Sequence, residues 1–312
     1  MSAHTAPDEA VRRAIELAGH APSLYNARPW SWEVSDAGLD LFLEDAGSFP
    51  VTDPDQREMR IGCGAALDHL QVALAAAGWR CEIEPSSGQK DGLLAQVRLT
   101  EIGQVDEATL RLAESIEHRH NDRRPFAPDP VSDEALAALQ ASAAGDGVHL
   151  QIVTRDEHRV WLSVLSERAG MLQSAQDGYA DELRRATGPH DHGGNIAADA
   201  VPHVVSPRHT DVTLRDFELV APGTLEIPES VDEHPVWGIL WTDGDGDVDW
   251  LLAGRALSRL LLHATQRGLA TGIQSQPVEV PMIRAQINEH LLTGLGHAQV
   301  LIRIGWPGTT DS

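Results

Sequence analysis

Several features that would assign the chain to a specialised class of protein are scarce in its 312 residues. There are only two cysteines, Cys63 and Cys81, which excludes a framework of disulfides. No run of about 18 apolar residues occurs, which excludes a transmembrane helix, and the polar start of the sequence does not resemble a secretion signal. Basic residues are outnumbered by acidic ones, and the formal net charge of −23 argues against binding to nucleic acid or to an anionic membrane.

The residues that are present are those of a folded globular protein. Hydrophobic residues make up 42% of the chain, and its length suffices for one large domain or two of ordinary size. Cys63 lies among glycines at the start of an apolar stretch, which predicts a packed thiol. We therefore expect a globular protein of the cytoplasm.

Hydrophobic periodicity predicts an irregular succession of helices and strands. Apolar residues three and four positions apart indicate helices near residues 7–19, 57–77, 106–118, 132–142, 156–175 and 250–267. Short apolar or alternating runs indicate strands near residues 32–34, 39–43, 82–83, 96–100, 150–154, 236–241 and 299–304. Because the order lacks a regular βαβ alternation, we expect an α+β fold of helices packed on mixed or antiparallel sheets. No Gly-x-Gly-x-x-Gly motif follows a strand, so a Rossmann-type dinucleotide site has no support.

The sequence contains an internal repeat with an insertion. Residues 64–78 and 254–268 match in their small residues, their leucines and a final glycine, at a shift of 190 residues. A weaker match links residues 8–11 with residues 133–136, at a shift of 125. The difference between the two shifts predicts about 65 extra residues in the second half. Glycines and prolines, which break long elements, are frequent between residues 165 and 235. Since long irregular segments of compact domains are usually functional, we interpret 165–235 as a cover over a site.

Two polar stretches are candidates for chemistry. The first, residues 21–30 (APSLYNARPW), follows a predicted helix and combines short hydroxyl and amide side chains with a Pro-Trp pair. The second, residues 119–126 (RHNDRRPF), gathers cations within a few residues, as a phosphate site requires. A basic helix end that complements the helix dipole explains the second stretch equally well, and Pro29–Trp30 fits an anchor of the strand to the core.

The two stretches together resemble the cofactor-contacting motifs of the nitroreductase family, whose members are FMN-dependent NAD(P)H oxidoreductases. Residues 119–123 (RHNDR) resemble the arginine-rich motif of that family, with Asn121 where serine is usual. The resemblance implies that Arg119, His120 and Asn121 hold the phosphate and ribityl chain of FMN. It also implies that Arg123 faces the N1 and C2-carbonyl edge of the flavin and stabilises the negative charge of reduction.

The first stretch resembles the flavin-facing segment of the same family. Four of its residues match that segment: Pro22, Ser23, Tyr25 and Asn26. Arg28 stands where glutamine is usual. Ser23 is not surrounded by a Gly-x-Ser-x-Gly motif, so the sequence does not support a hydrolase nucleophile there.

A third segment extends the resemblance toward the C-terminus. The family has a Pro-x-Glu-Gly segment whose backbone crosses one flavin face and donates an N–H toward N5. The matching residues here are Pro277, Val278, Glu279 and Val280, the last in place of glycine. An ordinary loop is the alternative interpretation. Many relatives also carry a basic residue after a Gly-Tyr-Pro-like segment; none follows Gly305-Trp306-Pro307 here, and Arg303 is a candidate substitute.

The arrangement of the motifs resembles one branch of the family. Ordinary nitroreductases are homodimers with flavin at the subunit interface, whereas here the first half keeps the proline-serine-asparagine motif and the second half keeps the arginine-rich motif. This pattern is similar to the dormancy-associated, Acg-like branch of actinobacterial nitroreductases. The resemblance implies a nitroreductase-like fold with two tandem halves, 1–105 and 106–312, that form an intramolecular pseudo-dimer around one flavin site. We therefore expect a monomer.

The resemblance also implies an activity. NAD(P)H would reduce FMN, which would pass a hydride through flavin N5 to a small acceptor such as a nitroaromatic compound or a quinone. No catalytic side chain is expected beyond Arg123 as a charge stabiliser, because the flavin carries the chemistry. Two alternatives remain open: a protein that stores or sequesters FMN beneath its cover with little turnover, and a relative that has lost the flavin.

Metal binding has little support in the sequence. Residues 243–249 (DGDGDVD) lack the glycine and glutamate of a calcium loop and fit a polar turn before a helix. Four histidines of the insertion lack the spacing of zinc ligands: His190, His192, His203 and His209. We expect no metal site.

Overall fold

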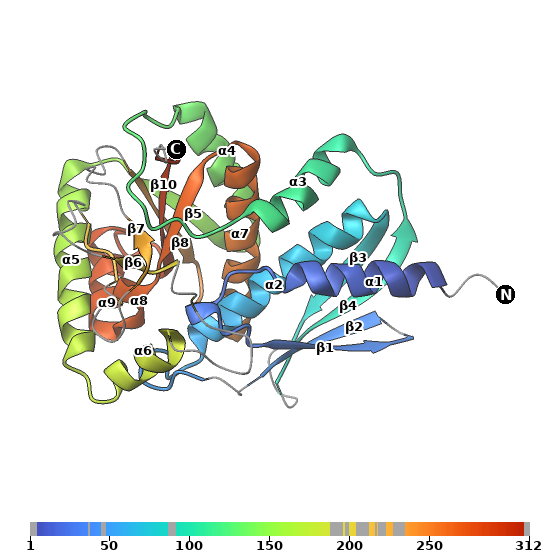
Figure 1. The fold of residues 1–312 in the computed structure, drawn as a ribbon, viewed down its shortest axis with the longest axis horizontal. Helices are drawn as coiled ribbons and strands as arrows, with labels where there is room; N and C mark the ends of the chain where they lie inside the picture. Colours follow the sequence, from blue (N-terminus) through green and yellow to red (C-terminus); the bar gives the residue numbers. More distant parts are fainter. Residues whose placement is uncertain are drawn as a thin grey trace.

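Two antiparallel sheets and a central pair of crossing helices organise the fold (Figure 1). The computed structural model describes residues 5–36, 38–44, 48–86, 92–187, 196, 200–203, 212–215, 217, 223–226 and 235–308. Each four-stranded sheet lies on its own side of the helix pair, so the predicted α+β class with antiparallel sheets is confirmed. A short parallel pair, β6 (Pro202–His203) with β7 (Leu225–Glu226), is separate from both.

The first sheet belongs to the N-terminal part of the chain and has one covered face. This part of the chain contains, in order, α1 (Thr5–Ala18), the 3₁₀ turn η1 (Leu24–Asn26), β1 (Trp30–Ser35), β2 (Gly38–Leu43), α2 (Arg57–Ala76), β3 (Trp79–Pro85) and β4 (Leu93–Ile102). The strand order is β1-β2-β4-β3. Residues 81–84 (CEIE) of β3 alternate, which turns Cys81 and Ile83 toward the core beneath α2 and both glutamates toward solvent.

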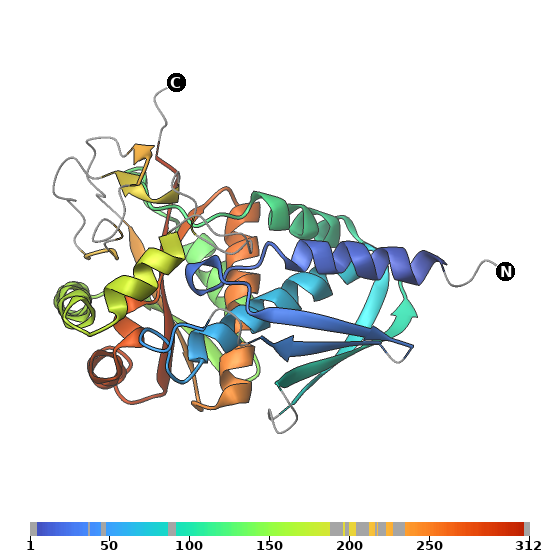
Figure 2. The ribbon, with the colours of Figure 1, turned by 60° about the horizontal axis from the view of Figure 1, so that its bottom comes forward.

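The second sheet is covered on both faces. Its strands are β5 (Val148–Val153), β8 (Val236–Thr242), β10 (His297–Gly305) and β9 (Ala270–Gln274), in that order across the sheet. One face packs on α7 (Asp247–Gln266), and the other packs on α5 (Asp156–Ser174) and α9 (Pro281–His290) (Figure 2). Consecutive residues of β10 are therefore buried, Leu301 on one face and Ile302 on the other, so its sequence is an almost continuous apolar run.

The two central helices approach each other closely at a pair of glycines. A Cβ on Gly64 of α2 would lie 2.0 Å from the carbonyl oxygen of Leu251, and one on Gly254 of α7 would lie 1.9 Å from that of Ile61. Gly64 and Gly254 are 190 residues apart, and so are Ile61 and Leu251, which is the predicted shift of the repeat. The two sheets also share one strand order, with β5, β8, β10 and β9 in the places of β1, β2, β4 and β3.

The helices and strands expected from periodicity are all present, and several others were not predicted. The expected helices near 106–118 and 132–142 are α3 (Glu107–His118) and α4 (Asp133–Ala143), each capped by an acceptor side chain. The elements missed are β9, α6 (Tyr179–Thr187), α8 (Gln276–Glu279) and α9, besides the short η1, β6 and β7. A signal for α9 was available, because Pro281 begins it and Ile283 and Ile287 are spaced for one buried face.

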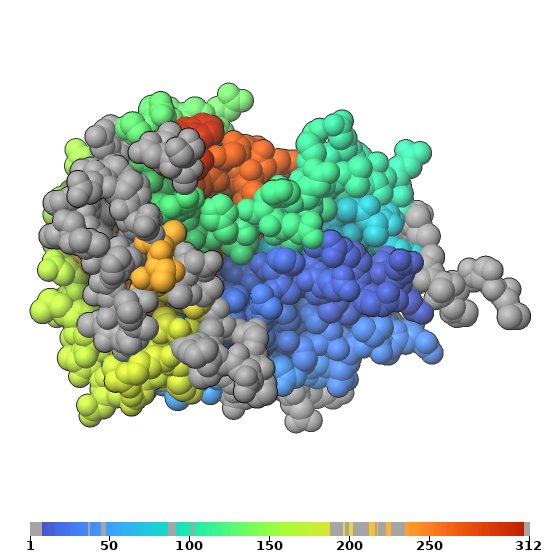
Figure 3. All heavy atoms as spheres, in the orientation of Figure 1, coloured from blue at the N-terminus to red at the C-terminus, as the bar shows by residue number. Residues whose placement is uncertain are grey.

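The predicted insertion lies between two paired strands. β1 and β2 are joined by a tight hairpin, whereas the connection from β5 to β8 spans 154–235 and includes α5 and α6. The insertion expected at 165–235 falls within this connection, and its bounds stay a prediction. Much of 188–234 lies outside the described residues. In Figure 3 the blue to cyan part of the chain lies toward the right of the view, and the turquoise-green segment that includes α3 lies above it (compare Figure 1).

Candidate functional site

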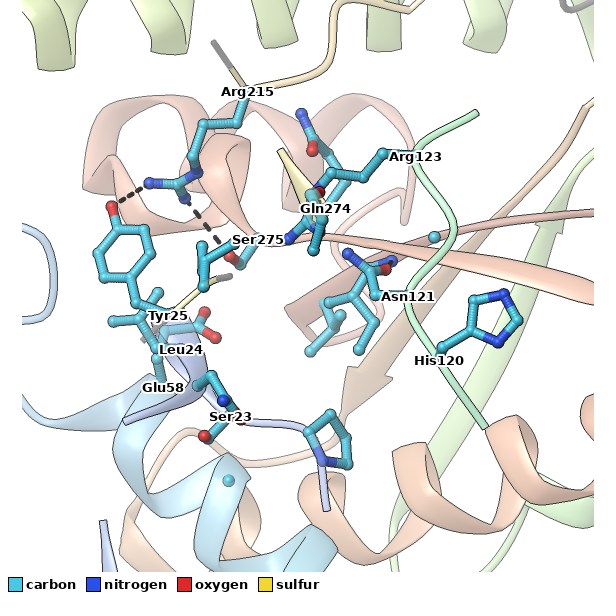
Figure 4. A pocket seen from close by; sticks show the side chains of 18 of the residues that line it. Ser23, Leu24, Tyr25, Glu58, His120, Asn121, Arg123, Arg215, Gln274 and Ser275 are labelled. Atoms are coloured by element: carbon cyan, nitrogen blue, oxygen red, sulfur yellow. Dashed lines mark hydrogen bonds between the residues drawn. The ribbon is translucent and has the colours of Figure 1, made fainter. Parts of the chain in front are cut away.

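A cavity of about 410 Å³ lies where the two parts of the chain meet. Residues 21–26 line it from the first part, and residues 119–123 line it from the second. The remaining walls come from α2, α7, β9 and β10, from Ser275 after β9, and from described residues of the connection 154–235. In Figure 4, Ser23, Tyr25 and Glu58 lie on one side of the open centre, and Asn121 and Arg123 lie on the other. The structure thus brings together all eight residues predicted in the first two stretches.

The first stretch has an unusual backbone. Tyr25, Asn26 and Arg28 have φ values of 49°, 57° and 50°, in the left-handed region that non-glycine residues rarely adopt. The hydroxyl oxygen of Ser23 accepts a hydrogen bond from the Arg28 amide at 3.0 Å, which closes the turn. A Cβ on Gly62 would lie 3.0 Å from that of Ser23, so the glycine allows the turn to lie directly on α2. Strained positions of this kind cluster at ligand sites.

The start of β1 anchors this turn to the core. Trp30 packs on the core of the first sheet, as predicted for the Pro-Trp pair. Cys63 is fully buried and donates a weak hydrogen bond to the carbonyl oxygen of Pro29, and burial raises the pKa of its thiol. The predicted packed thiol is therefore confirmed.

The second stretch runs along the edge of β9. The Asp122 amide donates to the Thr271 carbonyl at 2.8 Å, and the Asn121 side-chain oxygen accepts from the Ile273 amide at 2.6 Å. Arg303, 1% exposed, donates to the carbonyl oxygens of Asp122 and Arg124 at 2.9 and 2.8 Å. Arg303 therefore lines the cavity and also fixes the backbone of the arginine-rich stretch.

The cations of this stretch have different partners. Arg124 forms a two-pronged ion pair with Asp122, at 2.9 and 2.8 Å. Burial alone would raise the pKa of Asp122, but hydrogen bonds from His120 and Arg124 outweigh it and hold that pKa below its usual range. His120 is mostly exposed, and the same carboxylate raises its pKa. The charge of Arg124 is therefore neutralised by Asp122. A cation that binds an anionic ligand has to be another residue of the stretch 119–126.

Arg119 is a cation in a cavity wall without an acidic partner among the described residues. One of its terminal nitrogens donates to the His20 carbonyl at 3.1 Å, while its Nε is buried with no partner in the described part of the chain. Burial lowers the pKa of Arg119 to about 10, and no described carboxylate offsets the lost hydration. A buried guanidinium in this state favours an anionic ligand.

Residues of the connection 154–235 form the remaining wall. Arg123 donates to the Ala200 carbonyl at 2.9 Å and stacks over the Phe217 ring at 5.2 Å. Arg215 is buried and donates to the hydroxyl oxygen of Tyr25 (Figure 4). It also forms an ion pair with Glu279. These contacts connect both predicted stretches to the connection 154–235.

Comparison of the sequence with known proteins gives full-length similarities. No family model matches the chain. It is 31% identical to the Mycobacterium tuberculosis protein provisionally named NAD(P)H nitroreductase Rv3131, over 98% of this chain and 88% of the relative. It is 32% identical to the provisionally named NAD(P)H nitroreductase acg of the same species, over 95% of this chain and 89% of the relative. The chain belongs to the nitroreductase family, in its Acg-like branch.

Solved structures of nitroreductases are more distant from this Acg-like nitroreductase. An FMN-bound nitroreductase from Bacteroides fragilis is 15% identical, with a TM-score of 0.38, over 64% of this chain and 92% of that one. A BluB-like flavoprotein from Clostridium difficile is 15% identical, with a TM-score of 0.40, over 64% of this chain and 92% of that one.

The third predicted segment lies outside the cavity of this Acg-like nitroreductase. Residues 277–279 belong to the short helix α8, where Pro277 and Val278 are buried. The Glu279 carboxylate, which is fully buried, is bound by Arg215 and accepts from Ser275 at 2.6 Å. Val280 follows the helix and caps α9. The chain reaches the cavity just before this segment, with residues 272–275.

Two charged cavity residues outside the predicted stretches, Glu58 and Arg215, were missed from the sequence. Glu58 lies in the first turn of α2, where an acidic residue is ordinarily explained by the helix dipole. Arg215 lies in the connection 154–235, where no sequence pattern marked it. Glu58 had no sequence signal either, since its place in the cavity depends on the packing of α2 beneath residues 22–25.

The described residues contain no group of three or more histidine, cysteine, aspartate or glutamate side chains able to hold a metal ion. His190, His192 and His209 lie outside the described residues, and residues 243–246 form a turn before α7. Among the helices of the described ranges, none combines the length and apolar character needed to cross a bilayer.

Proposed function

We propose that the chain is an FMN-dependent NAD(P)H oxidoreductase of the nitroreductase or quinone-reductase type that reduces a small-molecule acceptor. The observation that carries the proposal is the single cavity lined by both predicted stretches, which lie about a hundred residues apart in sequence. Membership of the Acg-like branch supports the same assignment, since relatives over nearly the whole length are provisionally named NAD(P)H nitroreductases.

The residues of the cavity fit FMN. Its volume of about 410 Å³ is in the range of small-molecule sites, roughly 300–1,000 Å³. The buried Nε of Arg119 suits the phosphate, as the family resemblance implies, and His120 and Asn121 would complete the phosphate and ribityl contacts. Pro22, Ser23, Tyr25 and Asn26 would lie against the ring. Residues 277–280 do not line the cavity and would only support residues 272–275, which do.

Bound FMN would supply two-electron transfer between the nicotinamide and the acceptor. Arg123, as a cation in the cavity wall, would stabilise negative charge on the reduced ring. Leu214 and Phe217 of the covering segment would limit access of water from the opposite side. These side chains would bind and orient the ligands and shield them from water.

We further propose that residues 1–105 and 106–312 are the two halves of a pseudo-dimer with one flavin site in a monomer. The shared strand order and the glycine pairing across α2 and α7 support this division. The arginine-rich stretch occurs once, so the stoichiometry would be one FMN per chain. The net charge of −23 disfavours nucleic acid as a partner. The cytoplasmic location expected from the sequence stays a prediction.

The visible spectrum of the purified protein tests the assignment. A yellow protein that bleaches near 450 nm when NADPH is added anaerobically, and recovers when a quinone is added, is the expected result. Size-exclusion chromatography with a flavin assay gives the oligomeric state and the FMN content per chain. A colourless protein that also fails to quench the fluorescence of added FMN would refute the proposal.

FMN storage is the alternative function, and the covering segment favours it. Arg215 and Phe217 line the cavity and contact residues of both stretches, so the segment could block access of the nicotinamide. A storage protein would be yellow and stay yellow with NADPH. Rapid bleaching would exclude it.

A further inference from the structure

A buried cluster of acids and arginines lies at one end of the cavity. Three carboxylates, Asp53, Glu58 and Glu279, influence one another there, and two guanidiniums, Arg57 and Arg215, oppose them. A third arginine, Arg284 of α9, is paired with Asp245 and adds no net charge. If all groups were ionised, the cluster would carry one excess negative charge in a desolvated place. Such a cluster retains a proton on one of its acids.

The partners of the three acids indicate which one holds that proton. Asp53 accepts from the backbone amides of Glu58 and Met59 at 3.1 and 3.0 Å, at the start of α2. Glu279 is bound by Arg215 and accepts from Ser275 and Gln173. Burial raises the pKa of Asp53, but its two amide donors stabilise the carboxylate, and Glu279 has a cation and two hydrogen-bond donors.

Glu58 has the weakest support for a negative charge. Among the described residues, its side chain is bonded to Arg57 alone. It is 6% exposed, and it is the acid of this cluster whose side chain lines the cavity, where Figure 4 shows it between Tyr25 and Ser23. Burial raises the pKa of Glu58 to about 7, with Arg57 opposing and the charges of Glu279 and Asp53 adding to the rise.

We propose that Glu58 is a catalytic acid, which donates the proton that a quinone needs when it is reduced in this cavity. This inference rests on the proposed flavin-dependent function. The quinone gains two electrons and one hydrogen as hydride from the reduced cofactor, and its oxygen gains one proton from the Glu58 carboxyl. The products are a hydroquinone, oxidised cofactor and the Glu58 carboxylate, which regains a proton from water.

The test compares acceptors that do and do not need a proton. Glu58→Gln keeps the shape and polarity of the side chain but carries no transferable proton. We expect quinone reduction to fall about 100-fold, as for loss of a general acid, while ferricyanide, which accepts single electrons without a proton, reoxidises the reduced protein at the parent rate. Because both rates come from one preparation, their ratio corrects for partial loss of folded protein. Exposed Glu33 supplies a matched control, since Glu33→Gln leaves the ratio unchanged.

An infrared titration provides a readout independent of turnover. The parent protein should show the C=O stretch of a buried carboxylic acid that disappears as pH rises through about 7, and Glu58→Gln should lack this band. Asp53→Asn removes one neighbouring charge and should move the midpoint to lower pH. Quinone and ferricyanide rates that keep their parent ratio in Glu58→Gln, in a protein that binds FMN and bleaches with NADPH, would overturn the inference alone. A protein that binds no FMN would overturn the proposed function instead.

Discussion

Replacing Gly254 with alanine tests the close approach of α2 and α7 on which the cavity depends. The added Cβ would lie 1.9 Å from the Ile61 carbonyl oxygen and 2.9 Å from the Ala65 amide nitrogen. Both obstacles are backbone atoms, so the helices have to separate. Overpacking of this kind costs about 3 kcal/mol, and the gain in helix propensity from glycine to alanine offsets about 1 kcal/mol. We expect a net loss of about 2 kcal/mol in the free energy of unfolding.

Urea unfolding followed by circular dichroism measures this loss. With a slope of about 3 kcal/mol per molar urea, the midpoint should fall by about 0.7 M. Gly170 of α5 is the matched control, because a Cβ there meets only the Gln276 side chain, at 3.7 Å. Gly170→Ala should leave the midpoint unchanged or raise it by up to about 0.3 M. Gly64→Ala should behave like Gly254→Ala, and the two losses should not add, since the first already separates the helices.

Equal urea midpoints of Gly254→Ala and Gly170→Ala would refute this reasoning. If Gly254→Ala is as stable as Gly170→Ala, α2 and α7 do not touch at these glycines. The positions of Glu58 and Gly62, which reach the cavity from α2, would then need another explanation.

Three further predictions concern charged residues in and near the site. Arg119→Gln should weaken FMN binding about 10- to 100-fold in a fluorescence titration, because a hydrogen bond to a charged group contributes about 1.5–3 kcal/mol; an unchanged affinity would contradict the phosphate role. Burial lowers the pKa of His69 to about 3, so the folded protein stays neutral at this imidazole at pH values below about 6.5, where the unfolded chain binds a proton. Relative to His69→Gln, the free energy of unfolding of the parent should therefore fall by about 2 kcal/mol between pH 7 and pH 5 in urea titrations. A difference that does not change with pH would argue against a neutral buried imidazole. Arg215→Met leaves Glu279 buried without its cation and should destabilise the protein by about 3 kcal/mol, with Glu279→Gln restoring part of the loss; equal stability of parent and single variant would show that the pair is not buried.

Local patterns in the sequence were enough to find most of the fold. The alternation of residues 81–84 and the apolar run of β10 each identified a strand, because side-chain direction follows backbone periodicity. The repeat around Gly64 and Gly254 was visible because both helices meet the same requirement for small residues at a contact. By contrast, β9 and α8 follow each other within ten residues, too short for a periodic signal.

The site was predictable only where a residue type is required locally. The turn at residues 22–26 and the cation-rich stretch at residues 119–123 have recognisable compositions, and the structure brings them to one cavity. Residues 277–280 matched a motif as well, but helix α8 turns them into the core, and residues 272–275 take their place at the cavity.

The sequence by itself determined most of the longer helices and strands, the repeat and two of the stretches that line the cavity, since these depend on neighbours a few residues apart. Only the tertiary structure decided that Arg124 is neutralised by Asp122, that Arg119 keeps a buried nitrogen without a described partner, and that Glu58 shares its surroundings with two other acids. The physical reason is that charge state depends on burial and on which groups come within hydrogen-bonding distance, near or far in sequence, and both are fixed only once the chain has folded.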